Sequence, residues 1–429
     1  MRPGTFRSLR NRNYRIWASG AIVSNVGTWM QRIGQDWVVL TELTDNNATA
    51  VGIVTALQFG PRVLLLPLTG YAADHFDRRK LLVATQAGMG VLAFGLGLLC
   101  LLGHVALWHV YVFAFLLGCV TAFDAPARQT FVSDLVTQRD LANAVALNST
   151  SFNAARMIGP AVAGVLISHI GVGWVFLVNA LTYAGVIASL GFLRADELQP
   201  RPRPVRTRGS LGEGMRYVWR RGDLRTVFVM LFLIGTFGLN FAIYISTMTV
   251  SVFGGDAGQY GFLTSMMAVG SVSGALLAAG REKPGVASLL GGALLFGTGF
   301  AVAAVMPGYW SFGVVLAVIG LAAQTFTTTA NAAVQLSTEP ALRGRVMALL
   351  MTITLGGAPL GAPLVGWVAD AFGPRWAMSI GAASGLAATA VGVAYLAHAG
   401  RIAIERQGRW PRIVLRPRPG ADTAGDPPG

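Results

Sequence analysis

Long apolar runs separated by short polar breaks dominate this chain of 429 residues. An apolar run of about 20 residues is the length at which a helix crosses the hydrocarbon core of a bilayer. The pattern therefore predicts an all-α polytopic membrane protein with twelve membrane helices. We expect them at residues 14–42, 49–72, 80–103, 107–130, 141–169, 172–194, 223–252, 258–280, 285–306, 309–336, 345–371 and 374–399.

Composition agrees with a membrane protein and argues against several kinds of chemical site. Charged residues make up 12% of the chain, against about 25% in soluble proteins. Cys100 and Cys119 both lie inside apolar runs, which predicts neither a disulfide nor a metal site. The histidines lack metal-ligand spacing, and neither Lys80 nor Lys283 follows the glycine of a phosphate-binding loop. We expect no cofactor, no metal and no enzymatic activity.

The net charge of +14 is distributed unevenly among the loops. Basic residues gather before the first run, after every second run and at 401–418, whereas the opposite loops contain only Arg375. By the positive-inside rule, both termini and the central loop face the cytoplasm of a bacterial-type inner membrane. The basic excess then indicates orientation, and we expect no nucleic-acid partner.

A polar segment between the sixth and seventh runs divides the chain. RADELQPRPRPVRTRG is rich in proline and arginine, which favours an extended linker, and LGEGMRYVWRR follows with its apolar residues on one helical face. Such a helix is typical of the inner membrane surface. We predict a six-helix bundle at 1–194, a linker with an amphipathic helix at 195–222, a second six-helix bundle at 223–400 and a disordered basic tail at 401–429.

An internal repeat relates the two predicted bundles. Parallel repeats of this kind place a substrate site near the bilayer midplane, between the halves. A shift of 202 residues aligns Gly118 with Gly320, Gly159 with Gly361, Gly164 with Gly366, Gly171 with Gly373 and Trp174 with Trp376.

The stretch GYAADHFDRRK, here called the charge motif, concentrates charge between the second and third runs. Its spacing and place resemble the major facilitator superfamily, and the resemblance extends over nearly the whole chain. FDAPARQTFVSDLV and NYRIWASGAIVSNVGTWMQRIGQDWVVLTELT resemble the branch with enterobactin exporters and macrolide efflux proteins. The pattern G-x-x-x-D-x-x-D-R-R-K is formed by Gly70, Asp74, Asp77, Arg78, Arg79 and Lys80.

The resemblance implies that the charge motif gates the cytoplasmic side. Gly70 would let two helices approach closely, while Asp74 would face the N-terminus of the eleventh helix and pair with Arg128. The alternative is that the motif only anchors a short inner loop. The second half keeps only GREK at 280–283, so we expect a one-sided gate.

Charged residues inside a membrane are costly and therefore functional candidates. Asn25, Trp29, Arg32 and Asp36 recur at helical spacing, which places them on one face of the first helix. Arg32 and Asp36 can pair directly. If they line a cavity, Asp36 could alternate between a bound proton and the Arg32 contact, and this would couple transport to protons. The alternative is an ion pair at the outer surface.

Two further arginines lie near mid-depth, Arg62 in the second helix and Arg156, beside Asn153, in the fifth. Each could bind an anionic group of a substrate or pair with a carboxylate. The available acids are Asp36 and, in the fourth helix, Asp124. A static buried ion pair is the structural alternative.

Two proline-containing stretches indicate gating. Pro126 can kink the fourth helix next to Asp124, for which we favour a gating function. In the fifth helix GPAVAG contains Gly159, Pro160 and Gly164, whose small residues permit close helix packing. This stretch resembles the antiporter motif of superfamily exporters, which implies export.

The second half offers polar but uncharged candidates, Asn240, Tyr244 and Gln324. A cavity with charges on one wall and aromatic and polar groups on the other suits an amphipathic molecule. We predict a monomeric, proton-coupled exporter of a drug or siderophore in the lipid bilayer. The alternatives are an uncoupled facilitator or a lipid or metabolite transporter of the same fold and, more remotely, a membrane-embedded enzyme.

Overall fold

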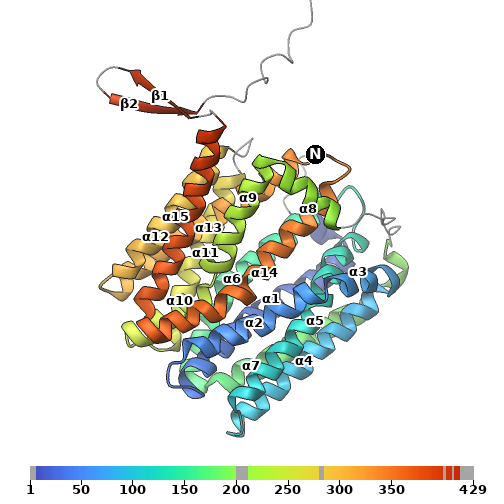
Figure 1. Cartoon of the computed structure of the whole chain (residues 1–429). Coiled ribbons are helices and arrows are strands. Elements are labelled where there is room, and N and C mark those ends of the chain that lie inside the picture. Colours follow the sequence, from blue (N-terminus) through green and yellow to red (C-terminus); the bar gives the residue numbers. More distant parts are fainter. Residues whose placement is uncertain (1–5, 200–210, 280–284, 400–401, 408–409, 416–429) are drawn as a thin grey trace, which may run out of the picture.

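The computed structural model describes residues 6–199, 211–279, 285–399, 402–407 and 410–415 (Figure 1). Within these ranges the side chains at 67, 70, 73, 74, 211, 279, 355 and 402–415 are outside the description. Two positions of the charge motif, Gly70 and Asp74, are among them. Their predicted part in gating therefore stays a prediction.

Helices account for most of the described chain, with short π or 3₁₀ turns labelled η. In the first half they are η1 (Arg7–Arg10), α1 (Arg12–Trp37), η2 (Val38–Glu42), α2 (Ala48–Leu64), α3 (Leu66–His75), α4 (Arg78–Leu101), α5 (Leu107–Asp134), α6 (Leu141–Ile170), α7 (Val172–Gly191) and η3 (Ala195–Glu197). In the second half they are α8 (Leu211–Arg220), α9 (Gly222–Leu233), η4 (Ile234–Gly238), α10 (Phe241–Thr247), η5 (Met248–Val252), α11 (Ala257–Ala279), α12 (Val286–Val305), α13 (Tyr309–Ser337), α14 (Arg343–Phe372) and α15 (Pro374–His398).

Nine helices among the described residues are long and apolar enough to cross a membrane, the run from α9 to η5 counting as one. The other three predicted spans are also helical, and composition or length explains the difference. α1 and α6 carry many polar residues, while α2 has 17 residues and is separated from α3 by Leu65. Pro67 is the second residue of α3 and provides no backbone N–H next to this break.

The helices form two groups that meet along two seams. In the first group α1 packs on α6 and α7, and α4 on α5 and α7; in the second α11 packs on α13, and α12 on α13 and α15. The seams are α2 against α14 and α6 against α11 (Figure 1). Each seam joins one helix from each half of the sequence.

Equivalent glycines stand at equivalent crossings, as the 202-residue repeat predicts. A Cβ atom at Gly118 would lie 2.8 Å from the Gln58 carbonyl oxygen, and one at Gly320 would collide with the Met267 carbonyl oxygen. α5 thus approaches α2 as α13 approaches α11. Gly171 and Gly373 likewise end α6 and α14 with φ of 86° and 100°, a region that favours glycine.

The seams are tight at only one end. Gly164 of α6 lies against the Ala257 carbonyl at the start of α11, and Gly366 of α14 lies against the Ala48 carbonyl at the start of α2. This end is opposite α8 (Figure 1). Towards α8, neither α3 nor α5 packs comparably against α13 or α14 in the part of the chain that the structure describes. The halves are closed together at one end and separated at the other.

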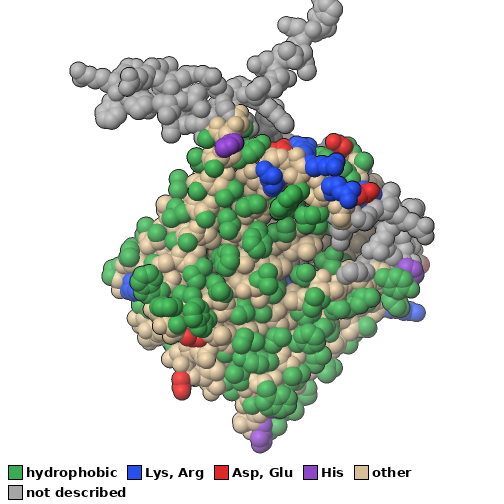
Figure 2. Space-filling model, in the orientation of Figure 1, with side chains coloured by type: hydrophobic (Ala, Val, Ile, Leu, Met, Phe, Trp, Pro, Cys, Tyr) green, Lys and Arg blue, Asp and Glu red, His purple; other side chains and the backbone are tan. Residues whose placement is uncertain are grey.

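The flanks of the molecule are apolar. Large exposed side chains include Val91, Phe94, Leu181 and Trp310. On the face drawn in Figure 2, hydrophobic side chains cover the sides of the helices, and the main group of basic side chains lies near α8. A surface of this kind matches a lipid environment around the middle of the helices.

The basic tail differs in part from its prediction. Disorder was expected from 401 to 429, but β1 (Ile402–Gln407) and β2 (Trp410–Leu415) pair antiparallel, with Ile402 opposite Leu415. Isoleucine in both segments and valine in β2 favour strands, which explains the difference. The rest of the tail lies outside the described residues.

Candidate functional site

A cavity of about 320 Å³ lies between the two halves. It is near the lower end of the range for small-molecule sites. Three larger hollows are present among the described residues. Those of about 740 and 600 Å³ are each bounded by one half only, so movement between the halves would not open or close them. The third, of about 350 Å³, lies at the closed end, between the start of α2 and the end of α14. The central cavity is lined from the first half by Trp29, Arg32, Asp36, Gln58, Phe59 and Arg156, and from the second by Asn240, Phe241, Ile243, Tyr260, Met267 and Thr354, among others.

The predicted face of α1 enters this cavity. Trp29, Arg32 and Asp36 line it together, because positions three and four apart lie on the same side of a helix. Asn25 stands one turn before Trp29 and accepts a hydrogen bond from Arg128 Nη1 at 3.0 Å. The helical spacing therefore located the cavity wall, with Asn25 in a neighbouring polar cluster.

Asp36 is bound across the interface between the halves. The Tyr260 hydroxyl of α11 donates to Asp36 Oδ2 at 3.0 Å, and both side chains are buried. The direct Arg32–Asp36 ion pair predicted from the sequence is wrong, since none joins them in the described part of the chain. The Arg32 guanidinium instead lies 4.7 Å from the Trp29 ring centroid and 5.4 Å from that of Phe59.

Arg62 and Arg156 also lack carboxylate partners among the described residues. Arg62 Nε donates to the Thr121 hydroxyl at 3.2 Å, and its guanidinium lies 4.8 Å from the Phe59 ring centroid. Arg156 lies 5.8 Å from the Trp29 ring centroid. The predicted alternative of static ion pairs with Asp36 or Asp124 is therefore incorrect.

Asp124 belongs to a separate buried cluster. It accepts hydrogen bonds from Thr85 at 2.9 Å and Gln86 at 2.8 Å, and it forms an ion pair with Arg128 at 3.1 Å. Arg128, proposed from the sequence as the partner of Asp74, is thus engaged by Asp124 and Asn25. The cluster joins α1, α4 and α5, which is compatible with the gating function predicted for Asp124.

The described part of the charge motif has structural contacts. Asp77 caps α4 by accepting from the Lys80 amide at 2.8 Å, and Arg79 donates to the Gly191 carbonyl at 3.5 Å. Arg78 pairs with the buried Asp134 of α5 at 2.7 Å. Asp134 was not predicted, although it lies in the family-like stretch FDAPARQTFVSDLV.

Of the other predicted polar residues, only Asn240 reaches the cavity. Its Nδ2 donates to the Thr236 carbonyl at 2.7 Å, while its buried Oδ1 has no partner. Asn153 and Gln324 bond within their own helices, to Ser149 and Thr328. Neither residue lines this cavity in the described part of the chain, and their part in substrate binding stays a prediction.

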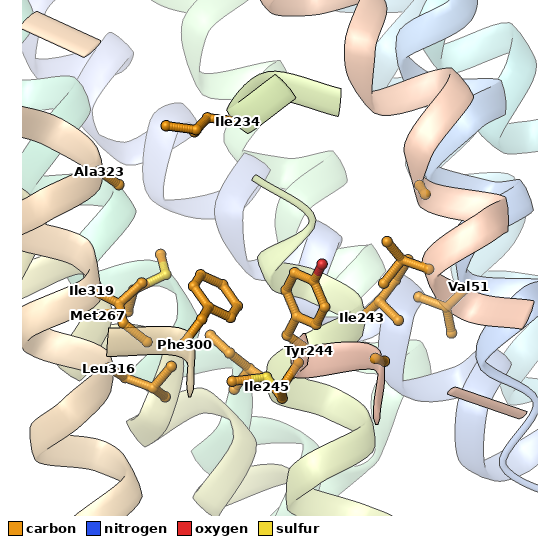
Figure 3. Close-up of a cluster of buried hydrophobic side chains, with 14 of the residues drawn as sticks. Val51, Ile234, Ile243, Tyr244, Ile245, Met267, Phe300, Leu316, Ile319 and Ala323 are labelled. Carbon is orange, nitrogen blue, oxygen red and sulfur yellow. The ribbon is translucent and has the colours of Figure 1, made fainter. Parts of the chain in front are cut away.

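Tyr244 is a core residue and does not line the cavity. Its hydroxyl donates to the Phe237 carbonyl at 2.6 Å, and its ring centroid lies 5.0 Å from that of Phe300. Figure 3 shows the two rings in a cluster with Ile245, Leu316 and Ile319. The predicted substrate contact through Tyr244 is corrected accordingly.

The closed end contains a contact that sequence reasoning missed. Asp370 Oδ1 at the end of α14 accepts from the Ala48 amide at 2.7 Å, and Oδ2 accepts from the Thr49 amide at 2.8 Å and from the Thr49 hydroxyl. One half thus supplies an acid to the helix N-terminus of the other. In the sequence Asp370 is a single acid near the end of an apolar run, and such a position gave no signal of this partner.

The GPAVAG stretch of α6 lies at two crossings. A Cβ atom at Gly159 would lie 2.6 Å from Cβ of Trp29 on α1, and one at Gly164 would lie 2.6 Å from the Ala257 carbonyl oxygen on α11. The Pro160 carbonyl packs against Gly261 of α11. These small residues therefore position the cavity wall and one of the seams.

Comparison with known proteins agrees with this architecture. Residues 3–416 match the family model described as transmembrane secretion effector. The chain is 28% identical over 371 residues to the staphyloferrin A transporter of Staphylococcus aureus, covering 84% of this chain and 90% of that protein. It is 26% identical over 370 residues to the enterobactin exporter EntS of Shigella flexneri, covering 83% and 85%.

A solved structure shares the fold. The structure of a bacterial homologue of the human lysosomal transporter Spinster, in an inward-facing and unoccupied conformation, aligns with a TM-score of 0.67 at 15% identity and covers 90% of this chain and 96% of that one. The resemblance to the major facilitator superfamily and the absence of an enzymatic role are thus confirmed. The chain belongs to the transmembrane secretion effector family of major facilitator transporters.

Proposed function

We propose that the protein is a proton-coupled exporter of an amphipathic small molecule that works by alternating access. Its relatives include proteins named as a staphyloferrin A transporter, an enterobactin exporter and a multidrug efflux pump. The antiporter-like GPAVAG stretch supports export. The single observation that carries proton coupling is the bond between Asp36 and Tyr260, which joins the two halves across the cavity.

The closed end of the molecule supports alternating access. The basic loops support an orientation in which the α8 end, where the halves are separated, faces the cytoplasm together with both chain termini. In this orientation the conformation faces inward. Opening to the outside then requires the seams at Gly164 and Gly366 to separate. We propose that a monomer carries out this alternating access in the bacterial inner membrane.

The Asp36–Tyr260 bond links this movement to protons. α1 and α11 belong to different halves, so opening the outer end breaks their hydrogen bond. A hydrogen bond to a charged group contributes about 1.5–3 kcal/mol, and one between neutral groups about 0.5–1.5 kcal/mol. A proton on Asp36 therefore lowers the cost of opening by roughly 1 kcal/mol. Proton occupancy and conformation become coupled through this side chain.

The test begins with cells that express the protein. They are screened for reduced accumulation of fluorescent amphipathic dyes that carry anionic, neutral or cationic groups. A dye that is transported is then followed in proteoliposomes with and without an imposed pH gradient. We expect the gradient to accelerate wild-type transport, and Asp36→Asn to remove that acceleration.

Asp196→Asn is the matched control, because Asp196 is exposed in η3, far along the chain from the cavity lining. It should respond to the gradient like the wild type. Transport that ignores the gradient in the wild-type protein would instead support the uncoupled facilitator. Gradient-driven transport that persists in Asp36→Asn would place coupling at another residue.

A further inference from the structure

Three arginines converge on one region of the first half from three different helices. Arg32 of α1 and Arg156 of α6 line the central cavity. Arg62 of α2 lines a small recess of about 20 Å³, which also includes Arg32 and Gln58. Arg32 therefore connects the recess to the cavity.

The charges of this region do not balance. Three guanidinium groups face one carboxylate, that of Asp36, among the described residues that line the cavity and its recess. Asp36 is already bound by Tyr260. The next acid, Asp124, is occupied by Arg128, Thr85 and Gln86. Arginine stays protonated in proteins, so the region keeps an excess of positive charge where a low dielectric makes it costly.

Aromatic rings contact only the flat faces of these guanidinium groups. Trp29 lies near both Arg32 and Arg156, and Phe59 lies near Arg32 and Arg62. A cation–π contact uses the flat face of a guanidinium, whereas its hydrogen-bond donors lie in the plane. Arg62 has a hydrogen bond to Thr121. Neither Arg32 nor Arg156 has a hydrogen-bond acceptor among the described residues.

The opposite wall of the cavity is uncharged. The second half contributes apolar side chains such as Phe241, Ile243 and Met267, and polar but neutral ones such as Asn240 and Thr264. A ligand that fits both walls must carry its charge on one side and an apolar body on the other. The sign of that charge follows from the unpaired donors of the first half.

We propose that Arg32 and Arg156 bind an anionic group of the substrate, such as a carboxylate or sulfonate, while its apolar body lies against Phe241 and Met267. This assignment rests on the proposed function, because it names the substrate class of the same cavity. A guanidinium donates two parallel hydrogen bonds to such an anion. The excess charge is then neutralised by the cargo itself.

Binding to the purified protein in phosphatidylcholine nanodiscs tests this without any transport step. The probes are the fluorophores anilinonaphthalene sulfonate and phenylnaphthylamine, which share an apolar scaffold and differ in the sulfonate. We expect the sulfonate probe to bind at least about tenfold more tightly, the factor for one charge-assisted hydrogen bond. Equal affinities, or tighter binding of the cation tetraphenylphosphonium, would overturn the assignment.

Variants of the cavity arginines distinguish binding at the proposed site from nonspecific adsorption of the probes. Arg156→Gln and Arg32→Gln should each weaken the sulfonate probe about tenfold and leave the neutral probe unchanged, whereas Arg156→Lys should keep part of the preference. Arg225→Gln is the control, because Arg225 is exposed at the start of α9 and does not line the cavity. A preference that survives both cavity variants contradicts the proposal.

A lipid headgroup could supply the same anionic chemistry, and a second nanodisc composition distinguishes it. If phosphatidylglycerol abolishes the sulfonate preference, the arginines bind an anionic lipid headgroup and the proposal of an anionic cargo is wrong. If the preference for the sulfonate probe persists in phosphatidylglycerol, the result supports an anionic cargo. Failure of proton coupling in proteoliposomes would leave this binding result intact, so the two proposals can fail separately.

Discussion

The contact of Asp370 with the start of α2 should favour the conformation in which the outer end is closed over the one in which it is open. Replacing Asp370 with alanine removes the acceptors of the Ala48 amide, the Thr49 amide and the Thr49 hydroxyl. α2 keeps its own cap, because Asn47 still accepts from the Ala50 amide. Asp370→Ala therefore weakens the contact between the halves and leaves the helix start intact.

The magnitude follows from the number of bonds and their exposure. Bonds to a carboxylate contribute about 1.5–3 kcal/mol when shielded, but Asp370 is exposed and water competes for each donor. We take about 2 kcal/mol for the three bonds together, which corresponds to roughly a 30-fold change in the ratio of closed to open outer ends. The expected result is a clear increase in the population with separated outer ends.

Spin-label distances measure this population. The labels are placed by Asp45→Cys and Phe372→Cys, both exposed near the closed end, in a background with Cys100→Ser and Cys119→Ser. Asp256→Ala is the control, since Asp256 caps its own helix through the Gln259 amide and has no hydrogen bond or ion pair across the seam with any described residue. If Asp370→Ala gives the same distance distribution as the control, the contact does not hold the halves together.

Two further variants test the seams and the buried cluster. Gly366→Ala should push α14 away from the Ala48 carbonyl and increase the population with separated outer ends in the same spin-label experiment. Gly185→Ala is the control, because a Cβ atom there meets open space. Equal distance distributions for the two variants would contradict the close approach at Gly366. Arg128→Gln leaves the buried Asp124 carboxylate with only neutral donors and should lower the free energy of unfolding by about 2–3 kcal/mol in a denaturation assay. Adding Asp124→Asn should restore part of that loss, and an additive double variant would show that the pair is not coupled.

The sequence determined what depends on local periodicity. Apolar runs located the helices, and the glycine repeat indicated crossings that recur in both halves. Trp29, Arg32 and Asp36 were placed on one wall because helical spacing fixes the relative direction of side chains on the same helix. The charge motif and the GPAVAG stretch identified the superfamily before any contact was known.

Only the tertiary structure decided which helices meet and how each is rotated. Tyr260 lies 224 positions from Asp36 in the sequence, and Asp370 lies 322 from Ala48, so no local pattern connects them. Tyr244 had a suitable residue type, but its hydroxyl donates to the Phe237 carbonyl in the core and it does not line the cavity. The absolute rotation of a helix is set by its neighbours' shapes, and these come from distant parts of the chain. The three arginines were visible in the sequence, whereas only the fold showed that they have no carboxylate partner in the part of the chain that the structure describes.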